Sequence, residues 1–308
     1  METLLDWGIH VVLGFQQFSP TFDVFFKSLT FLGNEEFFLL FLPLIYWCID
    51  RRTGVRLLFL LLFSVFIYSA AKVFLNQPRP FQYDSRVKQI VGAHGGGLPS
   101  GHTQNTVVLW GYLAYRFRQK IFWMITGFLI IGVPLSRIYL GVHFPTDIIG
   151  GYLLGILLLF GFIWLVPRAE AWMAGKGFKW QLGMAFIVPL VLIFISPGAD
   201  RECLTAGSTL WGVAVGVVLE RRWLRYSAAG LWWQKILRFL VGMVLLFGLW
   251  MGLRLGFQAL EPDYIFRVIR YALVGLGSSV GAPWLFMRIH LADTQAEISN
   301  SEFGIRNS

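Results

Sequence analysis

Residues 97–147, GLPSGHTQNTVVLWGYLAYRFRQKIFWMITGFLIIGVPLSRIYLGVHFPTD, contain the pattern that decides the fold. Polar side chains gather in this stretch and just upstream of it, in three clusters at the ends of apolar runs. The clusters are Lys72 with Arg79; Ser100, Gly101 and His102; and Arg137 with His143 and Asp147. Ionisable groups are costly inside a membrane, so we expect the three clusters to meet at one water-accessible site. The rest of the chain is then the scaffold that brings them together.

The composition is typical of a membrane protein. The chain has 308 residues, of which 56% are hydrophobic and 14% are charged, whereas about a quarter of the residues in a soluble domain are charged. Apolar blocks of about 20 residues, the length that a helix needs to cross a bilayer, alternate with short polar segments. The sequence therefore predicts an all-α polytopic membrane protein.

The spacing of the apolar blocks predicts four parts. Residues 1–34 form an amphipathic interfacial segment, 35–167 a core with the polar clusters, 168–290 a membrane-spanning extension, and 291–308 a polar, disordered tail. The predicted spans cover residues 35–49, 55–75, 101–117, 121–140, 145–166, 181–196, 204–219, 235–256 and 268–287. The four spans of the extension contain no comparable polar cluster. Gly151 and Gly155 have a spacing that permits close helix packing, which we expect within one subunit; a homodimer is the open alternative.

The net charge of +9 reflects the orientation of the chain in a membrane. Basic residues are concentrated in four alternating connections between predicted spans. They are Arg51, Arg52 and Arg56; Arg116, Arg118 and Lys120; Arg168, Lys176 and Lys179; and Arg221, Arg222, Arg225, Lys235 and Arg238. Such connections face the cytoplasm, so the polar clusters are expected on the opposite, periplasmic, extracellular or lumenal side. A bacterial cytoplasmic membrane or the endoplasmic reticulum fits this pattern, and we expect no nucleic-acid partner.

The cations of the clusters favour a phosphate. Lys72 and Arg79 are seven residues apart, two helical turns, so both are expected to point the same way. Arg137 adds a third cation from another span, and an arginine can bind phosphate through two N–H groups. A helix that begins at Ser100 and Gly101 adds backbone N–H groups, which favour an anion. Cys48 and Cys203 have no metal-ligand spacing, and we treat both as structural.

The two histidines supply chemistry. His143 and Asp147 are four residues apart, so the carboxylate is expected to hold one imidazole tautomer and leave the other nitrogen to attack phosphorus. His102 is then placed to donate a proton to the departing alkoxide, while the cations stabilise charge on the transferring phosphoryl oxygens. Each motif alone is a weak signal; the three together, at one membrane face, indicate phosphoryl chemistry.

The combined pattern resembles the signature of the type 2 phosphatidic acid phosphatase superfamily. The matching motifs are Lys72-x6-Arg79-Pro80, Pro99-Ser100-Gly101-His102 and Ser136-Arg137-x5-His143-x3-Asp147. That superfamily includes lipid phosphate phosphatases, undecaprenyl pyrophosphate phosphatases, glucose-6-phosphatases and vanadium haloperoxidases. The resemblance covers about residues 30–165 and implies a phosphatase that needs no metal or cofactor and forms a phosphohistidine. It implies His143 as nucleophile, Asp147 as its partner and His102 as general acid. The implied phosphate-binding residues are Lys72, Arg79, Ser100, Gly101 and Arg137.

A finer resemblance points to one branch of the superfamily. Gly33-Asn34-Glu35-Glu36-Phe37, the run from Leu42 to Trp47 and the following Asp50 are similar to sphingosine-1-phosphate phosphatases. Those proteins, like glucose-6-phosphatases, carry extra C-terminal spans. Gly101 stands where that branch usually has a threonine.

The leading hypothesis is therefore a lipid-phosphate phosphatase acting at the non-cytoplasmic leaflet. The candidate substrates are undecaprenyl pyrophosphate, phosphatidate or a single-chain lipid phosphate, because the clusters stand at span ends where a headgroup lies. A soluble sugar phosphate is an alternative substrate. Two alternative functions stay open: phosphoryl transfer to an acceptor other than water, and a catalytically silent transporter or scaffold of the same fold.

Overall fold

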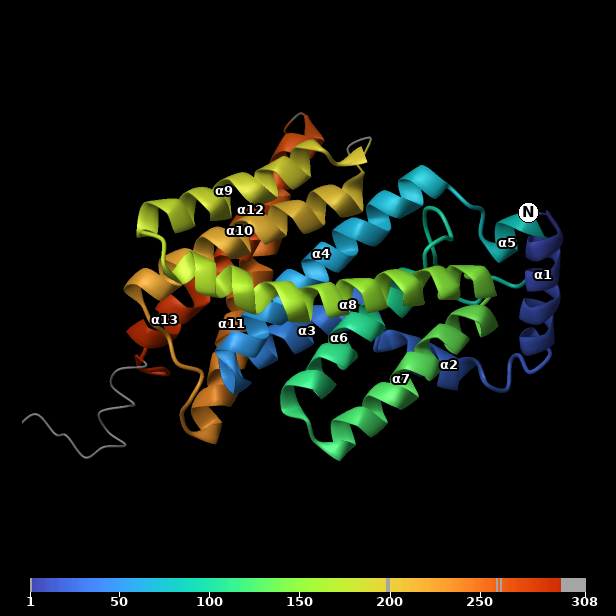
Figure 1. Ribbon diagram of the computed structural model, residues 1–308, viewed down its shortest axis with the longest axis horizontal. Helices are drawn as coiled ribbons and strands as arrows, with labels where there is room; N and C mark the ends of the chain where they lie inside the picture. Colours follow the sequence, from blue (N-terminus) through green and yellow to red (C-terminus); the bar gives the residue numbers. More distant parts are fainter. Residues whose placement is uncertain (1, 198–199, 259, 261, 295–308) are drawn as a thin grey trace, which may run out of the picture. The chain divides into compact units, whose positions relative to one another are not determined.

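The structure is a computed structural model that describes residues 2–197, 200–258, 260 and 262–294, and nearly all regular structure in these residues is helical (Figure 1). The elements are α1 (Glu2–Gln16), α2 (Asp23–Phe31), α3 (Glu35–Leu44), the π-helical turn η1 (Ile45–Ile49), α4 (Arg51–Leu75), α5 (Pro80–Tyr83), α6 (Gly101–Phe117), α7 (Lys120–Tyr139), α8 (Pro145–Ala174), α9 (Phe178–Phe194), α10 (Arg201–Trp223), α11 (Trp232–Gly256), α12 (Asp263–Leu276), the π-helical turn η3 (Gly277–Gly281) and α13 (Ala282–Arg288). The predicted all-α architecture is confirmed.

Six helical segments of the described chain are long and apolar enough to cross a membrane, and a seventh is added if α2 and α3 with η1, bent by 45°, count as one span. This is fewer than the nine spans predicted. The predicted spans 101–117 and 181–196 correspond to α6 and α9, which have only 17 residues each, whereas a bilayer needs about 20. The predicted span 35–49 is one arm of the bent pair.

The chain divides into two compact units. The first contains residues 1–38 and 64–168, and the second contains 39–63 and 169–308. Residues 39–63 were predicted to belong to the core with the polar clusters, residues 35–167. In the structure they group with residues 169–308 instead. The three polar clusters all belong to the first unit.

In the first unit, α6 is the buried helix. It packs against α7, and the glycines of α8 let that helix approach closely: a Cβ at Gly151 would lie 2.8 Å from Cβ of Thr103. Two polar residues of α6 bond to α4: Ser64 Oγ donates to Asn105 Oδ1 over 2.7 Å, and Gln104 Nε2 donates to Ser64 O over 3.0 Å. These bonds allow polar side chains to be buried and fix α6, whose first turn carries part of the site.

The N-terminal helix α1 also packs onto this unit. Its buried residues Leu5, Ile9 and Val12 form one apolar cluster with Phe144 and Ile148. Those two residues flank the start of α8, so α1 supports the segment that carries His143 and Asp147.

In the second unit, α10 packs along α9 and α12 (Figure 1). Arg238 is fully buried and donates to four carbonyl oxygens: Nε to Leu291 over 2.7 Å, Nη1 to Ala228 over 3.0 Å and to Trp47 over 3.5 Å, and Nη2 to Ala229 over 2.6 Å. The buried Glu220 accepts from Arg51 Nε over 2.9 Å and from the backbone N of Tyr226 over 2.8 Å.

The predicted tail begins at residue 291, but the chain is still packed there. Leu291 and Ala292 are buried, and Thr294 forms an isolated β-bridge with Tyr226. The remaining residues of that predicted tail, 295–308, lie outside the described residues.

Substitution of Glu220 tests how far the second unit depends on its buried ion pair. Glu220→Gln should lower the midpoint temperature of unfolding in detergent far more than Glu170→Gln. The Glu220 side chain is 0% exposed, whereas Glu170, which pairs with Arg52 and Arg56, is 23% exposed. Removing one partner of a buried pair costs about 3 kcal/mol or more, and a pair whose carboxylate is partly open to water costs less to break. Equal shifts for the two variants would contradict this account.

Candidate active site

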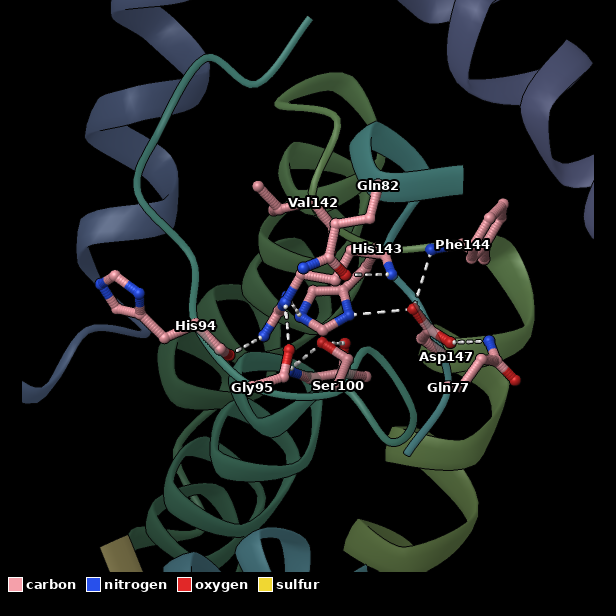
Figure 2. Close-up of polar contacts among 11 residues, drawn as sticks. Gln77, Gln82, His94, Gly95, Ser100, Val142, His143, Phe144 and Asp147 are labelled. Atoms are coloured by element: carbon pink, nitrogen blue, oxygen red, sulfur yellow. Dashed lines mark hydrogen bonds and ion pairs between the residues drawn. The ribbon is translucent and has the colours of Figure 1, made fainter. Parts of the chain in front are cut away.

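The three polar clusters meet within the first unit: Arg79 Nη1 lies 3.3 Å from His143 Nε2, and the backbone N of Ser100 donates to the backbone O of Asp147 over 3.0 Å. Figure 2 shows Ser100, His143 and Asp147 close together. They come from the end of α4 and the loop after it, from the first turn of α6, and from the α7–α8 connection with the ends of those two helices. The sequence prediction that they converge agrees with this arrangement.

The Asp147 side chain accepts three hydrogen bonds within the site. Its Oδ2 accepts from His143 Nδ1 over 3.0 Å and from the backbone N of Phe144 over 2.9 Å, and its Oδ1 accepts from Gln77 Nε2 over 2.8 Å (Figure 2). His143 is 2% exposed and Asp147 is 0% exposed. A hydrogen on Nδ1 of His143 leaves Nε2 with a lone pair, which is the tautomer that a nucleophile requires.

The local sequence explains how this carboxylate is held. Helix α8 begins at Pro145, a residue suited to the first helical position. Asp147 is the third residue of α8, and its side chain reaches back to the backbone N–H of Phe144, as an acid does in a capping box. Capping the helix and orienting His143 are thus done by one side chain.

Arg79 lies against the other nitrogen of the same histidine. Its Nη1 is 3.3 Å from His143 Nε2. The guanidinium donates to three backbone carbonyls: Nε to Gly95 over 3.0 Å, Nη2 to His94 over 2.6 Å and Nη1 to Val142 over 2.8 Å. These carbonyls hold the guanidinium of Arg79 in place, so its positive charge is fixed beside the His143 imidazole.

Arg137 is held differently. It stands in the last turn of α7, is 5% exposed, and donates from Nη1 to Thr30 Oγ1 over 2.8 Å. Among the described residues, its buried Nε has no hydrogen-bond partner. A buried donor without an acceptor is rare in folded proteins, and an anion in the site would satisfy it.

The first turn of α6 adds backbone donors. Ser100 is the N-cap residue: its Oγ accepts from Thr103 N over 3.4 Å and from Thr103 Oγ1 over 3.0 Å, and its own N donates to Asp147 O over 3.0 Å. The N–H groups of Gly101 and His102 that follow have no acceptor within the helix, which is the arrangement that binds anions at helix starts.

Gly101 is required by its neighbour. A Cβ at this position would lie 2.9 Å from Cε2 and Cζ of Tyr68. Lys72 Nζ lies 4.9 Å from the centre of the same ring. Tyr68 therefore links the α4 cation to the α6 start, and the close approach explains why glycine rather than threonine occupies position 101.

The electrostatics of His143 reflect the whole cluster. Burial lowers the pKa of His143 well below the ordinary histidine value. The positive charges of Arg79 and Arg137 lower this pKa further, and Lys72 adds to them. His143 is therefore neutral near pH 7 with a lone pair available. In the described part of the chain, no three His, Cys, Asp or Glu side chains gather as a metal site.

Besides Thr30, which bonds Arg137, two more residues of the site escape sequence analysis. Gln77 binds Asp147, and Asn34 Oδ1 lies 2.9 Å from Nε2 of His102. Gln77 directly precedes the Pro78–Arg79 segment, and Asn34 falls in the Gly33–Phe37 motif, but neither position carries a signal that names its partner.

Gly101→Ala tests the close contact with Tyr68. The added Cβ should lower the midpoint temperature of unfolding, because overpacking a tight contact costs about 1–3 kcal/mol. Gly127→Ala is the matched control: Gly127 lies inside α7 and has nothing within 4 Å of its Cβ position, so alanine there should keep or raise that temperature. Equal stability of the two variants would refute the crowding.

Comparison with known proteins gives the family. Residues 53–171 match the PAP2 superfamily, and residues 204–294 match the PAP2 superfamily phosphatase transmembrane extension. The first match contains all eight predicted site residues. The second covers much of the membrane-spanning extension predicted for residues 168–290.

Several curated proteins are similar to the chain. Lipid phosphate phosphatase delta of Arabidopsis thaliana is 25% identical over 68% of this chain, but the match spans only 55% of that protein. Phosphatidylglycerophosphatase B of Bacillus subtilis is 30% identical over 46% of this chain and 73% of its own length. Sphingosine-1-phosphate phosphatase 1 of Rattus norvegicus is 25% identical over 85% of this chain and 71% of its own length.

One solved structure is also similar, the crystal structure of the first transmembrane PAP2 type phosphatidylglycerolphosphate phosphatase from Bacillus subtilis. It has a TM-score of 0.48 and 22% identity, and the match covers 55% of this chain and 88% of that one. The family assignment rests on the sequence matches, with which the predicted resemblance agrees. The chain belongs to the PAP2 superfamily of phosphatases and carries the transmembrane extension of that superfamily.

Proposed function

We propose that the protein is an integral-membrane, metal-independent phosphatase that hydrolyses a lipid phosphomonoester or pyrophosphate through a phosphohistidine, at the non-cytoplasmic leaflet. The observation that carries the proposal is the meeting of two groups. His143 is held by Asp147 with Nε2 as the lone-pair nitrogen, and the same site contains the buried, unsatisfied Nε of Arg137. A tetrahedral phosphate supplies both an acceptor for the arginine and an electrophile for the histidine.

The reaction follows from these atoms. Nε2 of His143 attacks phosphorus, the bond from phosphorus to the leaving oxygen breaks, and His102 gives that oxygen a proton. Asp147 stabilises the positive charge that develops on the His143 ring. Water then attacks the phosphohistidine and gives a proton back to His102, the bond between nitrogen and phosphorus breaks, and inorganic phosphate leaves.

The remaining predicted residues are proposed to bind the phosphoryl oxygens. Arg137 provides Nε, and the first turn of α6 provides the N–H groups of Gly101 and His102. Ser100 caps that turn and adds a hydroxyl, and the charges of Lys72 and Arg79 complete the site. Fixed donors and cations of this kind stabilise the charge of the transition state.

A lipid substrate is supported by two observations. The site lies at the ends of apolar helices, where a headgroup is placed in a bilayer. The similar proteins are named for lipid phosphates, phosphatidylglycerophosphate and sphingosine-1-phosphate. Glucose-6-phosphatase 3 of Bos taurus is also similar, at 28% identity, so a sugar phosphate belongs in the substrate test.

Phosphate release by the detergent-purified protein, with a chelator present, tests the proposed function. The panel contains undecaprenyl pyrophosphate, phosphatidate, lysophosphatidate, sphingosine-1-phosphate and glucose-6-phosphate. We expect release from at least one lipid, and a loss of about a thousandfold or more in His143→Ala, because removing a nucleophile removes the whole covalent route.

The matched control is His10→Ala, which removes an exposed histidine of α1 and should leave the rate unchanged. A strict requirement for a divalent metal would contradict the proposed chemistry. Release from glucose-6-phosphate alone would contradict the lipid substrate, and activity retained in His143→Ala would contradict the nucleophile.

The distribution of basic residues in the connections supports a site at the non-cytoplasmic leaflet. This orientation has a separate test. Gly92→Cys, in the loop beside the site, should react with a membrane-impermeant maleimide in intact cells or in sealed right-side-out vesicles. Gly177→Cys, between α8 and α9, should react only after permeabilisation. Both glycines have open space at the Cβ position, and Cys48 and Cys203 are buried. The reverse pattern would contradict the proposed orientation.

A further inference from the structure

Residues 30–34, which are the end of α2 and the turn that joins it to α3, contact two residues of the site at once. They lie outside residues 53–171, which match the PAP2 superfamily, and outside the three motifs that define the predicted site. Asn34 contacts His102, Thr30 contacts Arg137, and Gly33 lies between them. Each contact uses a different kind of atom, so the three are independent observations.

The first contact fixes one edge of the His102 ring. Nε2 is 2.9 Å from Asn34 Oδ1. A Cβ on Gly33 would lie only 3.0 Å from Cδ2, the ring atom next to Nε2. The edge formed by Cδ2 and Nε2 therefore packs against the turn, and the opposite edge, which carries Nδ1, faces away from it. Because an amide oxygen only accepts hydrogen bonds, it favours the ring forms that keep a hydrogen on Nε2.

This preference suits a residue that acts first as an acid and then as a base. With its hydrogen on Nε2 held by Asn34, the proton that His102 gains and loses is the one on Nδ1. The protonated ring donates from Nδ1 to the leaving oxygen as the phosphorus–oxygen bond breaks. The neutral ring then has its lone pair on Nδ1 and accepts a proton from the attacking water.

The second contact fixes Arg137. Thr30 Oγ1 accepts from Nη1 over 2.8 Å, and both side chains are buried, at 4% and 5% exposure. The threonine engages the end of the guanidinium, and Nε has no protein acceptor among the described residues. The bond thus holds the arginine in the orientation in which Nε is left for an anion.

We propose that residues 30–34 are a positioning element of the active site, in which Asn34 selects Nδ1 of His102 as the proton-transferring atom and Thr30 orients Arg137 toward the phosphate. This role rests on the proposed function. It assigns the two ends of the turn to different steps: Asn34 acts on departure of the leaving group, and Thr30 acts on binding of the anion.

Asn34→Leu tests the first assignment through the leaving group. With a lipid phosphate, whose alkoxide needs a proton, kcat should fall about 10²-fold with little change in KM, the usual size of a general-acid effect. With p-nitrophenyl phosphate, whose leaving group departs without a proton, kcat should fall far less. Glu36→Gln, an exposed residue of the adjoining helix turn, is the matched control and should match wild type on both substrates. Equal losses on both substrates in Asn34→Leu would overturn the assignment.

Thr30→Val tests the second assignment through anion affinity. The valine keeps a similar shape but removes the hydroxyl oxygen, so inhibition by orthovanadate should weaken about tenfold. The ratio of the rates on the lipid and aryl phosphates should stay at the wild-type value. Unchanged vanadate affinity, or a changed rate ratio, would overturn the role of Thr30.

A second variant covers the case in which Asn34→Leu does not fold. Asn34→Asp keeps an oxygen at the same point but adds a negative charge, which favours the protonated ring. The basic limb of the kcat/KM profile should then move up by about one pH unit, and an unmoved limb would overturn the proposal. If wild type and Glu36→Gln release no phosphate from any substrate, the proposed function fails as well. If wild type is active but the variants do not show the expected ratios of lipid to aryl phosphate rates, only the positioning role fails.

Discussion

The oxygens of a buried carboxylate need hydrogen-bond donors. Asp147 finds its donors in several separate segments of the site. Its side chain accepts from the His143 ring, from the backbone N of Phe144 and from Gln77, and its own carbonyl oxygen accepts from the backbone N of Ser100. These four bonds tie the loop after α4, the start of α6 and the start of α8 to one residue. The geometry of the nucleophile, the helix start and the loop cannot change independently.

The balance of charge in the site favours an anion. The N–H groups of Arg79 donate to the carbonyls of His94, Gly95 and Val142, which orient the positive charge of the guanidinium. Asp147 is the carboxylate bonded to His143. Arg137 and Lys72 add positive charge that also acts on His143. An incoming phosphate therefore offsets an excess of fixed positive charge in a buried environment, where such interactions are stronger than in water.

Among its described residues, the second unit has no such collection of groups. Its buried charges, Glu220 and Arg238, are bonded to Arg51, to the backbone and to connecting segments, which ties residues far apart in the chain into one unit. Residues 39–63 belong to this unit although they precede most of the site in sequence. Helix α4 is therefore shared: its first half belongs to the second unit, and its last turn carries Lys72.

The sequence by itself determined the all-α membrane architecture, because bilayer length and the cost of buried charge leave few alternatives. It also predicted that three polar clusters converge, because ionisable side chains are costly inside a membrane unless they meet at one water-accessible site. Within one cluster, helical geometry alone brings His143 and Asp147 together, because they lie four residues apart. Only the tertiary structure decided which uncharged residues complete the site. Gln77 meets Asp147 across 70 positions, Asn34 meets His102 across 68, and Thr30 meets Arg137 across 107. Amide and hydroxyl side chains are common in loops and turns, and no pattern in the neighbouring sequence indicates which distant residue they bind. Their partners are set by the packing of whole helices. The structure also gave the helix lengths, which are 17 residues at α6 and at α9.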